Sequence, residues 1–179
     1  MIRSLLTYLA VCAAPIAVFW LAGRLIGLNR PFGGPTGRGW LDAEDAFDRA
    51  RRQHQRHHRL AVLDRQPHRL DLPILDEAAG LGPFGSRSAT ELLIPIGDIV
   101  GATDGADGKF DRDFLPTDER SRSRFQAIVI ALRRGEALPP IEVYQLHGHY
   151  YVSDGHHRVA AARALGEKFI AAYVTEILR

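Results

Sequence analysis

Residues 150–174 constrain the fold of this 179-residue chain more than any other segment. They read as a strand, a glycine turn, a short alanine-rich helix that Gly166 closes, and a second strand. The turn has the sequence Asp-Gly-His-His-Arg at positions 154–158. The first amide N–H groups of a helix have no intrahelical acceptor and lie at its positive end. Gly155 lets the backbone approach a ligand closely, and Arg158 adds a forked donor. The sequence therefore predicts a small anion site, with a nucleotide or another phosphorylated molecule as its ligand.

The segment from Leu138 to Val174 resembles the core of the ParB/sulfiredoxin fold, in which a strand precedes a Gly-x-x-Arg turn and an alanine-rich helix. The resemblance extends back to residues 94–100, which look like the opening strand of that family, and covers about residues 92–177. It implies an α/β domain of the α+β kind, a small mixed sheet with flanking helices, preceded by an N-terminal apolar helix and a basic helix. The residues that it assigns to nucleotide or phosphate binding are Gly155, His156, His157 and Arg158.

Two branches of this family use the turn differently. Gly155, His157 and Arg158 match the sulfiredoxin turn, but His156 stands where sulfiredoxins carry their reactive cysteine. The one cysteine of the chain, Cys12, lies in an apolar segment far from the turn, so we expect no sulfiredoxin activity. Partition proteins of the ParB type bind cytidine nucleotides at a Gly-Glu-Arg-Arg turn, of which this chain has the glycine and the last arginine. We see no helix-turn-helix segment after the turn and expect no specific DNA binding.

The residue types at the turn suit nucleotide hydrolysis or phosphoryl transfer. Arg158 and the turn amides would hold phosphate oxygens and offset the charge that develops on them. His156 or His157 would act as base or donor, because imidazole titrates near neutral pH. Asp111 and Asp113 are further catalytic candidates, although only the resemblance brings them near the turn.

A metal ion enters this chemistry only together with a nucleotide. Asp154 would help to hold a Mg²⁺ ion that bridges the phosphates of CTP or ATP. His147 and His149 lie about 15 Å from the turn at ~3.3 Å per strand residue, so we expect no metal site made of protein ligands alone. The aspartates of residues 104–113 lack the spacing of a calcium loop.

The N-terminal segment predicts a membrane anchor over residues 1–28. Residues 4–23 carry no charge, and at ~1.5 Å per residue such a helix covers a hydrocarbon core of about 30 Å. A buried core helix, a cleaved signal peptide and a mis-assigned start are the alternatives. Arg24, Arg30 and Arg38 follow, so the positive-inside tendency places the C-terminal domain in the cytoplasm. We therefore expect a single-pass protein of the cell membrane.

The remainder divides into a linker at 29–41, a basic helix with a turn-rich connector at 42–91, and the domain at 92–179. Through residues 49–65, the basic helix would contact an anionic membrane surface or a nucleic acid, unless these charges are merely solvated. The arginines of this stretch are Arg49, Arg51, Arg52, Arg56, Arg59 and Arg65.

Within the domain, we expect a strand at 94–100, an exposed loop at 101–109 and a helix that starts near Pro116 and ends at Gly135. A hairpin through His147-Gly148 should join strands at 141–146 and 149–153.

Two functions remain open at this point. The first is a nucleotide- or phosphate-binding domain, with slow NTP hydrolase or phosphotransferase activity, at the cytoplasmic face of the membrane. The second is a non-enzymatic protein-interaction module in which the turn is a structural cap. A composition of 46% hydrophobic and 25% charged residues supports one core, and a net charge of +2 does not indicate a general nucleic-acid binder.

Overall fold

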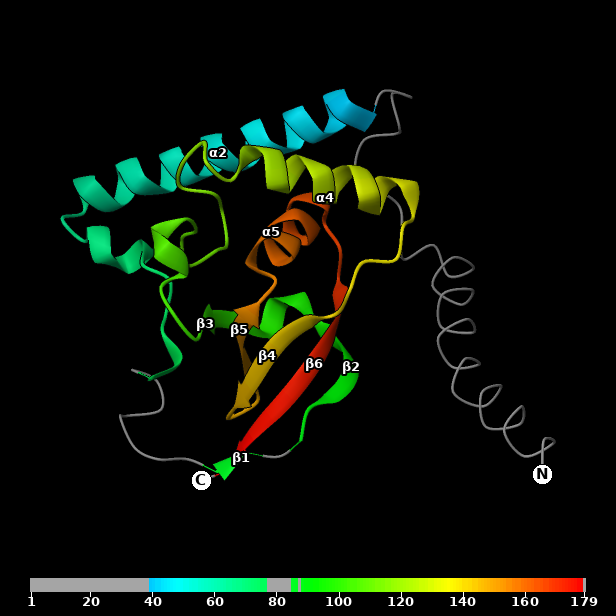
Figure 1. Cartoon of the computed structure of the whole chain (residues 1–179). Coiled ribbons are helices and arrows are strands. Elements are labelled where there is room, and N and C mark those ends of the chain that lie inside the picture. Colours follow the sequence, from blue (N-terminus) through cyan, green and yellow to red (C-terminus); the bar gives the residue numbers. More distant parts are fainter. Residues whose placement is uncertain (1–38, 77–84, 87, 179) are drawn as a thin grey trace, which may run out of the picture. The chain divides into compact units, whose positions relative to one another are not determined.

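The computed structural model describes residues 39–76, 85–86 and 88–178. They form a mixed sheet with flanking helices, which confirms the expected fold class (Figure 1). The predicted anchor at residues 1–28 and Cys12 lie outside the described residues. None of the described helices is long and apolar enough to cross a membrane.

The sheet combines parallel and antiparallel pairs in the order β1-β6-β4-β5-β3, and β2 also pairs with β6. β3 runs parallel to β5 and β4 runs parallel to β6, while the other pairs are antiparallel. The strands are β1 (Gly85–Ser86), β2 (Thr90–Pro95), β3 (Ile99–Ala102), β4 (Ile141–Leu146), β5 (His149–Asp154) and β6 (Phe169–Leu178).

The single strand that we predicted at 94–100 is wrong. The chain instead forms β2, a 3₁₀ turn at Ile96–Asp98 and then β3. Pro95 cannot donate to a sheet ladder, and the chain crosses here from a pair with β6 to a pair with β5. The predicted hairpin is confirmed, since β4 and β5 pair through a turn in which His147 and Gly148 both have positive φ, 50° and 82°.

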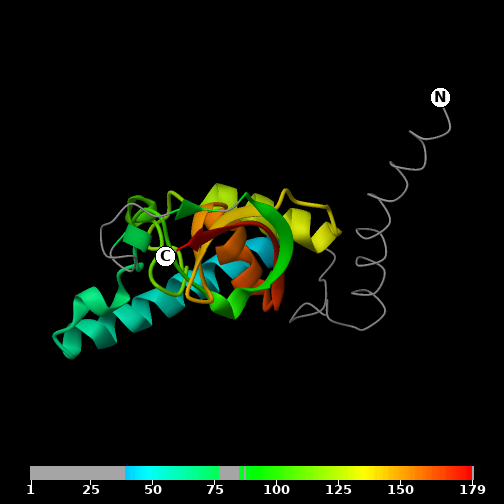
Figure 2. The same ribbon diagram turned by 90° about the horizontal axis from the view of Figure 1, so that it is seen from below.

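The α-helices of the described residues pack on one another, and α5 lies between the sheet and the other two (Figures 1 and 2). They are α2 (Gly39–Leu63), α4 (Arg122–Arg134) and α5 (His156–Leu165), and shorter 3₁₀ turns lie at Pro67–Leu70 and Ala106–Gly108. α4 ends at Gly135, as predicted, with φ 71°. It begins six residues later than we expected, because Arg51 of α2 donates to the carbonyl oxygens of Pro116 and Thr117 and holds that segment as a loop.

Helix α2 belongs to the same core as the sheet and the other helices. Ala43, Ala46 and Phe47 are fully buried, and Phe47 meets Phe125 of α4 edge-on at 5.4 Å between ring centroids. Residues 39–41, which we placed in the linker, form the first turn of α2. The small alanine side chains let α2 lie close to its neighbours, so its remaining side chains can reach the loop at 109–115.

Candidate functional site

The glycine of the turn is required by its backbone and by its surroundings. Gly155 caps α5 with φ 104° and ψ 18°, a left-handed conformation that side chains disfavour. A Cβ atom at this position would lie 2.5 Å from Cγ2 of Ile141 in β4. The α5 N-terminus has no side-chain cap. Among the described residues, no side chain accepts from its first amide N–H groups, which leaves them available to an anion.

Arg158 binds the backbone that leads into β4. Its Nη1 donates to the carbonyl oxygens of Pro139, at 2.5 Å, and Pro140, at 2.8 Å. Its Nη2 donates to Oδ2 of Asp154, and the two side chains form an ion pair. The Arg158 side chain is only 16% exposed. The two charged residues that we expected to hold a phosphate and its metal ion thus pair with each other in this structure.

The two histidines of the turn pack against aromatic rings from the loop at 109–115. The His156 ring lies stacked at 6.3 Å from both Phe110 and Phe114, and His157 meets Phe110 edge-on at 4.9 Å. His156 Nε2 is buried without a hydrogen-bond partner among the described residues, with Oδ1 of Asp104 3.9 Å away. The aromatic walls therefore remove both imidazoles from water and leave a nitrogen of His156 unpaired.

This burial lowers the pKa of both histidines. The pKa of His157 falls from 6.5 to about 4, chiefly through burial and further through the positive charge of Arg124. The pKa of His156 also falls, because burial outweighs the opposing carboxylates of Asp104 and Asp154. Both rings are consequently neutral at pH 7, and each has a nitrogen that can accept a proton.

A pocket of about 260 Å³ opens beside the turn, between α5, the loop at 104–110 and α4. Arg124 of α4 is exposed, lines the pocket and forms no ion pair with any residue that the structure describes. Lys109 also lines it and bonds Oδ2 of Asp107 at 2.6 Å. The pocket thus joins an uncapped helix start to a free guanidinium, while Asp104 and Asp154 add carboxylates.

The other two catalytic candidates face α2. Asp111 is buried, and its Oδ2 lies 2.7 Å from Nδ1 of His54. Its Oδ1 accepts the amide N–H groups of Asp113 and Leu115 at 3.0 and 2.9 Å. Asp113 lies 3.4 Å from Nδ1 of His57, and neither aspartate lines the pocket. Among the described residues, no group of three or more His, Cys, Asp or Glu side chains is placed to hold a metal ion.

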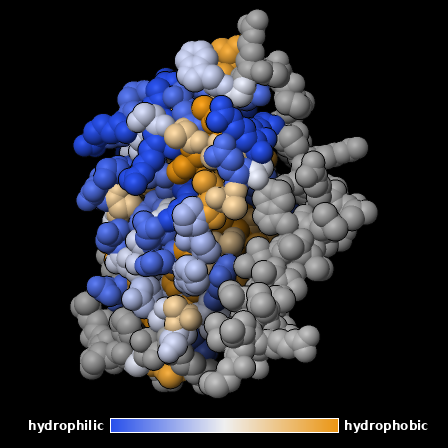
Figure 3. Space-filling model, turned by 45° about the vertical axis from the view of Figure 1, so that its right-hand side comes forward, coloured by the Kyte–Doolittle hydropathy of each residue, from blue (hydrophilic) through white to orange (hydrophobic). Residues whose placement is uncertain are grey.

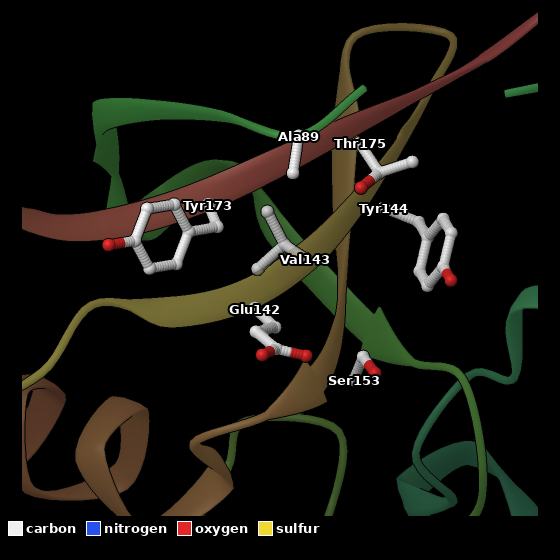
Figure 4. Close-up of a pocket in the computed structure, with 7 residues that line it drawn as sticks. All are labelled: Ala89, Glu142, Val143, Tyr144, Ser153, Tyr173 and Thr175. Carbon is white, nitrogen blue, oxygen red and sulfur yellow. The ribbon is translucent and has the colours of Figure 1, made fainter. Parts of the chain in front are cut away.

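A second pocket, of about 300 Å³, lies over β4, β5 and β6, and none of the predicted site residues lines it (Figure 4). Tyr173 and Tyr144 lie on opposite sides of Val143, and Glu142 points into the space beside them. Glu142 is the one charged residue of this lining. A pocket with a carboxylate and no cation does not suit an anion, so the pocket at α5 remains the candidate site.

Sequence reasoning missed Arg124 and Lys109. Arg124 lies in a run of alternating arginines and serines, residues 120–124, that leads into the first turn of α4, and nothing in the pattern separates it from its neighbours. Phe110 and Phe114 offered a signal, because aromatic residues four apart flank the two aspartates that we singled out. The site is therefore assembled by three separate segments, of which the sequence identified one.

Comparison with known proteins gives one partial likeness. No family model matches the chain, and no curated protein matches it. Among solved structures, sulfiredoxin from Arabidopsis thaliana is similar, with 21% identity, 48% of this chain and 83% of that chain covered, and a TM-score of 0.34. A TM-score this low supports no inference about activity, so the function has to be argued from the residues of the site.

Proposed function

We propose that the chain binds a phosphate-bearing ligand of the nucleotide class in the pocket beside Gly155, with the phosphate groups at the N-terminus of α5. The observation that supports this most directly is the uncapped start of α5, which opens into a pocket that also holds a free arginine. Amide N–H groups and the helix dipole favour an anion at such a position.

Arg124 is the cation best placed to bind that anion. Its guanidinium is exposed and has no carboxylate partner among the described residues, so a ligand does not have to displace one. Arg158 differs, because it already binds two carbonyl oxygens and Asp154. In this proposal Arg158 fixes the turn, and Arg124 contacts the phosphate.

The size of the pocket indicates which part of the ligand it takes. Its volume of about 260 Å³ is below the ~300–1,000 Å³ of pockets that enclose a whole small ligand. The phosphates would lie inside and the nucleoside outside. The exposed carboxylates of Asp104 and Asp154 would take part in holding a Mg²⁺ ion that accompanies CTP or ATP.

Slow hydrolysis or phosphoryl transfer extends the proposal. A neutral His156 or His157 would accept the proton of an attacking water or hydroxyl group. A base works only while it is unprotonated, so the activity would persist at neutral pH and disappear on acidification. Asp111 and Asp113 would act by positioning the loop that carries Phe110 and Phe114.

The alternative is a protein-interaction module without catalysis. It is favoured by the structural role of Arg158, whose described bonds all serve to attach the turn to β4 and Asp154. In that case the free helix start and Arg124 would be solvated, and the pocket would stay empty of nucleotides.

Calorimetric titration of the full chain with CTP, ATP and inorganic pyrophosphate, each with Mg²⁺, separates the two proposals. Arg124→Ala should weaken binding roughly 10- to 100-fold, the loss expected for one charge-assisted hydrogen bond. Arg134→Ala is the matched control, because Arg134 lies exposed at the other end of α4 and, among the described residues, pairs only with Glu136 at 3.5 Å. Its affinity should stay within about twofold of the parent. Absence of binding, or equal affinities in the Arg124 variant and the parent, would favour the interaction module.

A further inference from the structure

The solvent face of α2 carries a stripe of four arginines. Arg49, Arg52, Arg56 and Arg59 follow one another at spacings of three, four and three residues. At ~100° per residue they fall within an arc of about 80°. All four are exposed. The buried face of the helix, with Ala43, Ala46 and Ala50, points the other way.

These arginines have no carboxylate partners in the described part of the chain. Arginines on other sides of the helical layer do, since Arg51 lies 3.6 Å from Glu119 and Arg122 lies 3.0 Å from Asp48. The acidic residues of α2 all precede Arg49. Like charges three and four residues apart destabilise an isolated helix. Among the described residues, no ion pair offsets the repulsion between these four arginines. The stripe therefore destabilises the helix without stabilising the fold, which points to an external anionic partner.

Two large apolar side chains continue the same arc. Leu60 and Leu63 are 60% and 77% exposed, and they lie four residues beyond Arg56 and Arg59. Val62, beside them, is 51% exposed. Leucines that share a helix face with arginines give this end of α2 both charge and apolar surface.

The stripe lies on a part of the helix that a flat surface can reach. In Figures 1 and 2 the C-terminal half of α2 projects beyond the sheet and the other two helices. Figure 3 shows hydrophilic residues, in blue, over much of the described surface, with hydrophobic residues, in orange, between them. Arginines on such a projection can contact many headgroups at once.

We propose that this arginine–leucine face, Arg49 to Leu63, binds the surface of an anionic phospholipid bilayer. The four guanidinium groups would bind headgroup phosphates, and Leu60 and Leu63 would enter the boundary between headgroups and acyl chains. A nucleic acid would use the arginines but leave the leucines in water, so the leucine pair favours the lipid.

A fluorophore attached to the arginine–leucine face reports contact of this face with the bilayer, whether or not another part of the chain also binds the membrane. The full chain would carry Cys12→Ser and Gln53→Cys, labelled with an environment-sensitive dye, because Gln53 is exposed beside the stripe. Ser123→Cys on α4 is the control position. The Gln53 probe should respond to vesicles of phosphatidylcholine with phosphatidylserine and not to phosphatidylcholine alone. High salt should abolish the response.

Charge variants test the stripe. Each basic residue near an anionic surface raises the affinity for that surface about fivefold. Arg52→Gln/Arg56→Gln should therefore lower the ratio of membrane-bound to free protein, as the probe reports it, about 30-fold. Arg120→Gln/Arg134→Gln changes the net charge equally at exposed positions, 76% and 70%, and should stay within about twofold of the parent. Leu60→Ser/Leu63→Ser should weaken vesicle contact and leave binding to duplex DNA unchanged.

Three outcomes would overturn the proposal. They are equal probe signals with neutral and anionic vesicles, equal losses in the two arginine double variants, and duplex DNA binding that anionic vesicles do not compete with. The last outcome would assign the stripe to nucleic acid.

Discussion

The protein has two pairs of histidines that face the same loop from opposite sides, and their environments are opposite. His54 and His57 of α2 lie 2.7 and 3.4 Å from the carboxylates of Asp111 and Asp113. His156 and His157 of α5 instead pack on aromatic rings, and His156 Nε2 has no partner among the described residues. The first pair therefore binds carboxylates of the loop, whereas the second pair retains a ring nitrogen that can bind a ligand or accept a proton.

The loop explains how one segment creates both environments. Asp111 and Asp113 point to α2, whereas Phe110 and Phe114 contact the turn histidines. Because α2 binds the aspartates, we expect it to hold in place the aromatic rings that bury the turn histidines. The site at α5 would then depend on α2, although no residue of α2 lines its pocket.

The largest expected effect comes from the turn itself. Gly155→Ala should destabilise the protein by about 3 kcal/mol or more, because left-handed strain adds to an overlap with Ile141. Gly148→Ala is the matched control, since it has φ 82° but open space around the Cβ position. It should cost only about 1–2 kcal/mol, the strain alone. Denaturant unfolding measures both losses, and equal losses would show that Ile141 does not close on the turn.

The next largest loss of stability tests whether the two histidine pairs are linked through the loop. Asp111→Ala leaves His54 and two amide N–H groups without their partner in a buried place, so it should cost about 2–4 kcal/mol. Asp113→Ala, at a carboxylate 48% exposed, should cost less than about 0.5 kcal/mol.

The pKa of His157 provides a second measurement on the same variants. If α2 fixes the aromatic wall, NMR titration should show the pKa of His157 rising toward 6.5 in the Asp111 variant, because the ring regains water. An unchanged pKa of His157 in a folded Asp111 variant would show that α2 does not control the environment of the site.

The sequence predicted the parts of the fold that follow from local pattern. The β4–β5 hairpin, the end of α4 at Gly135 and the strand–turn–helix unit at Gly155 each rest on glycine or on residue periodicity. The corner at Ile96–Asp98 was missed, because β2 and β3 separate only when they find different partners in the sheet. Such a choice depends on residues far along the chain.

The candidate site was predicted in part for the same reason. Gly155, His156 and His157 are neighbours in sequence, so their placement at the helix start followed from the motif. Arg158 was predicted as the anion ligand, yet the structure gives its guanidinium the carbonyl oxygens of Pro139 and Pro140. A backbone segment that approaches from another strand leaves no mark in the local pattern, and Arg124 reaches the pocket from a separate helix.

The smallest effect tests, through the pH dependence of stability, whether His157 of the second pair is held neutral. In the folded protein His157 has a pKa of about 4, below its ordinary 6.5, so the unfolded chain binds more protons between these values. Stability should therefore be complete above about pH 6.5 and fall as the pH drops toward 4. After allowance for partial solvation of the ring, the loss should stay below about 1 kcal/mol at pH 5.5. His157→Gln should flatten this slope in denaturant midpoints measured across the window. A slope that is as steep in the His157 variant as in the parent would mean that the aromatic wall does not hold the turn histidine neutral.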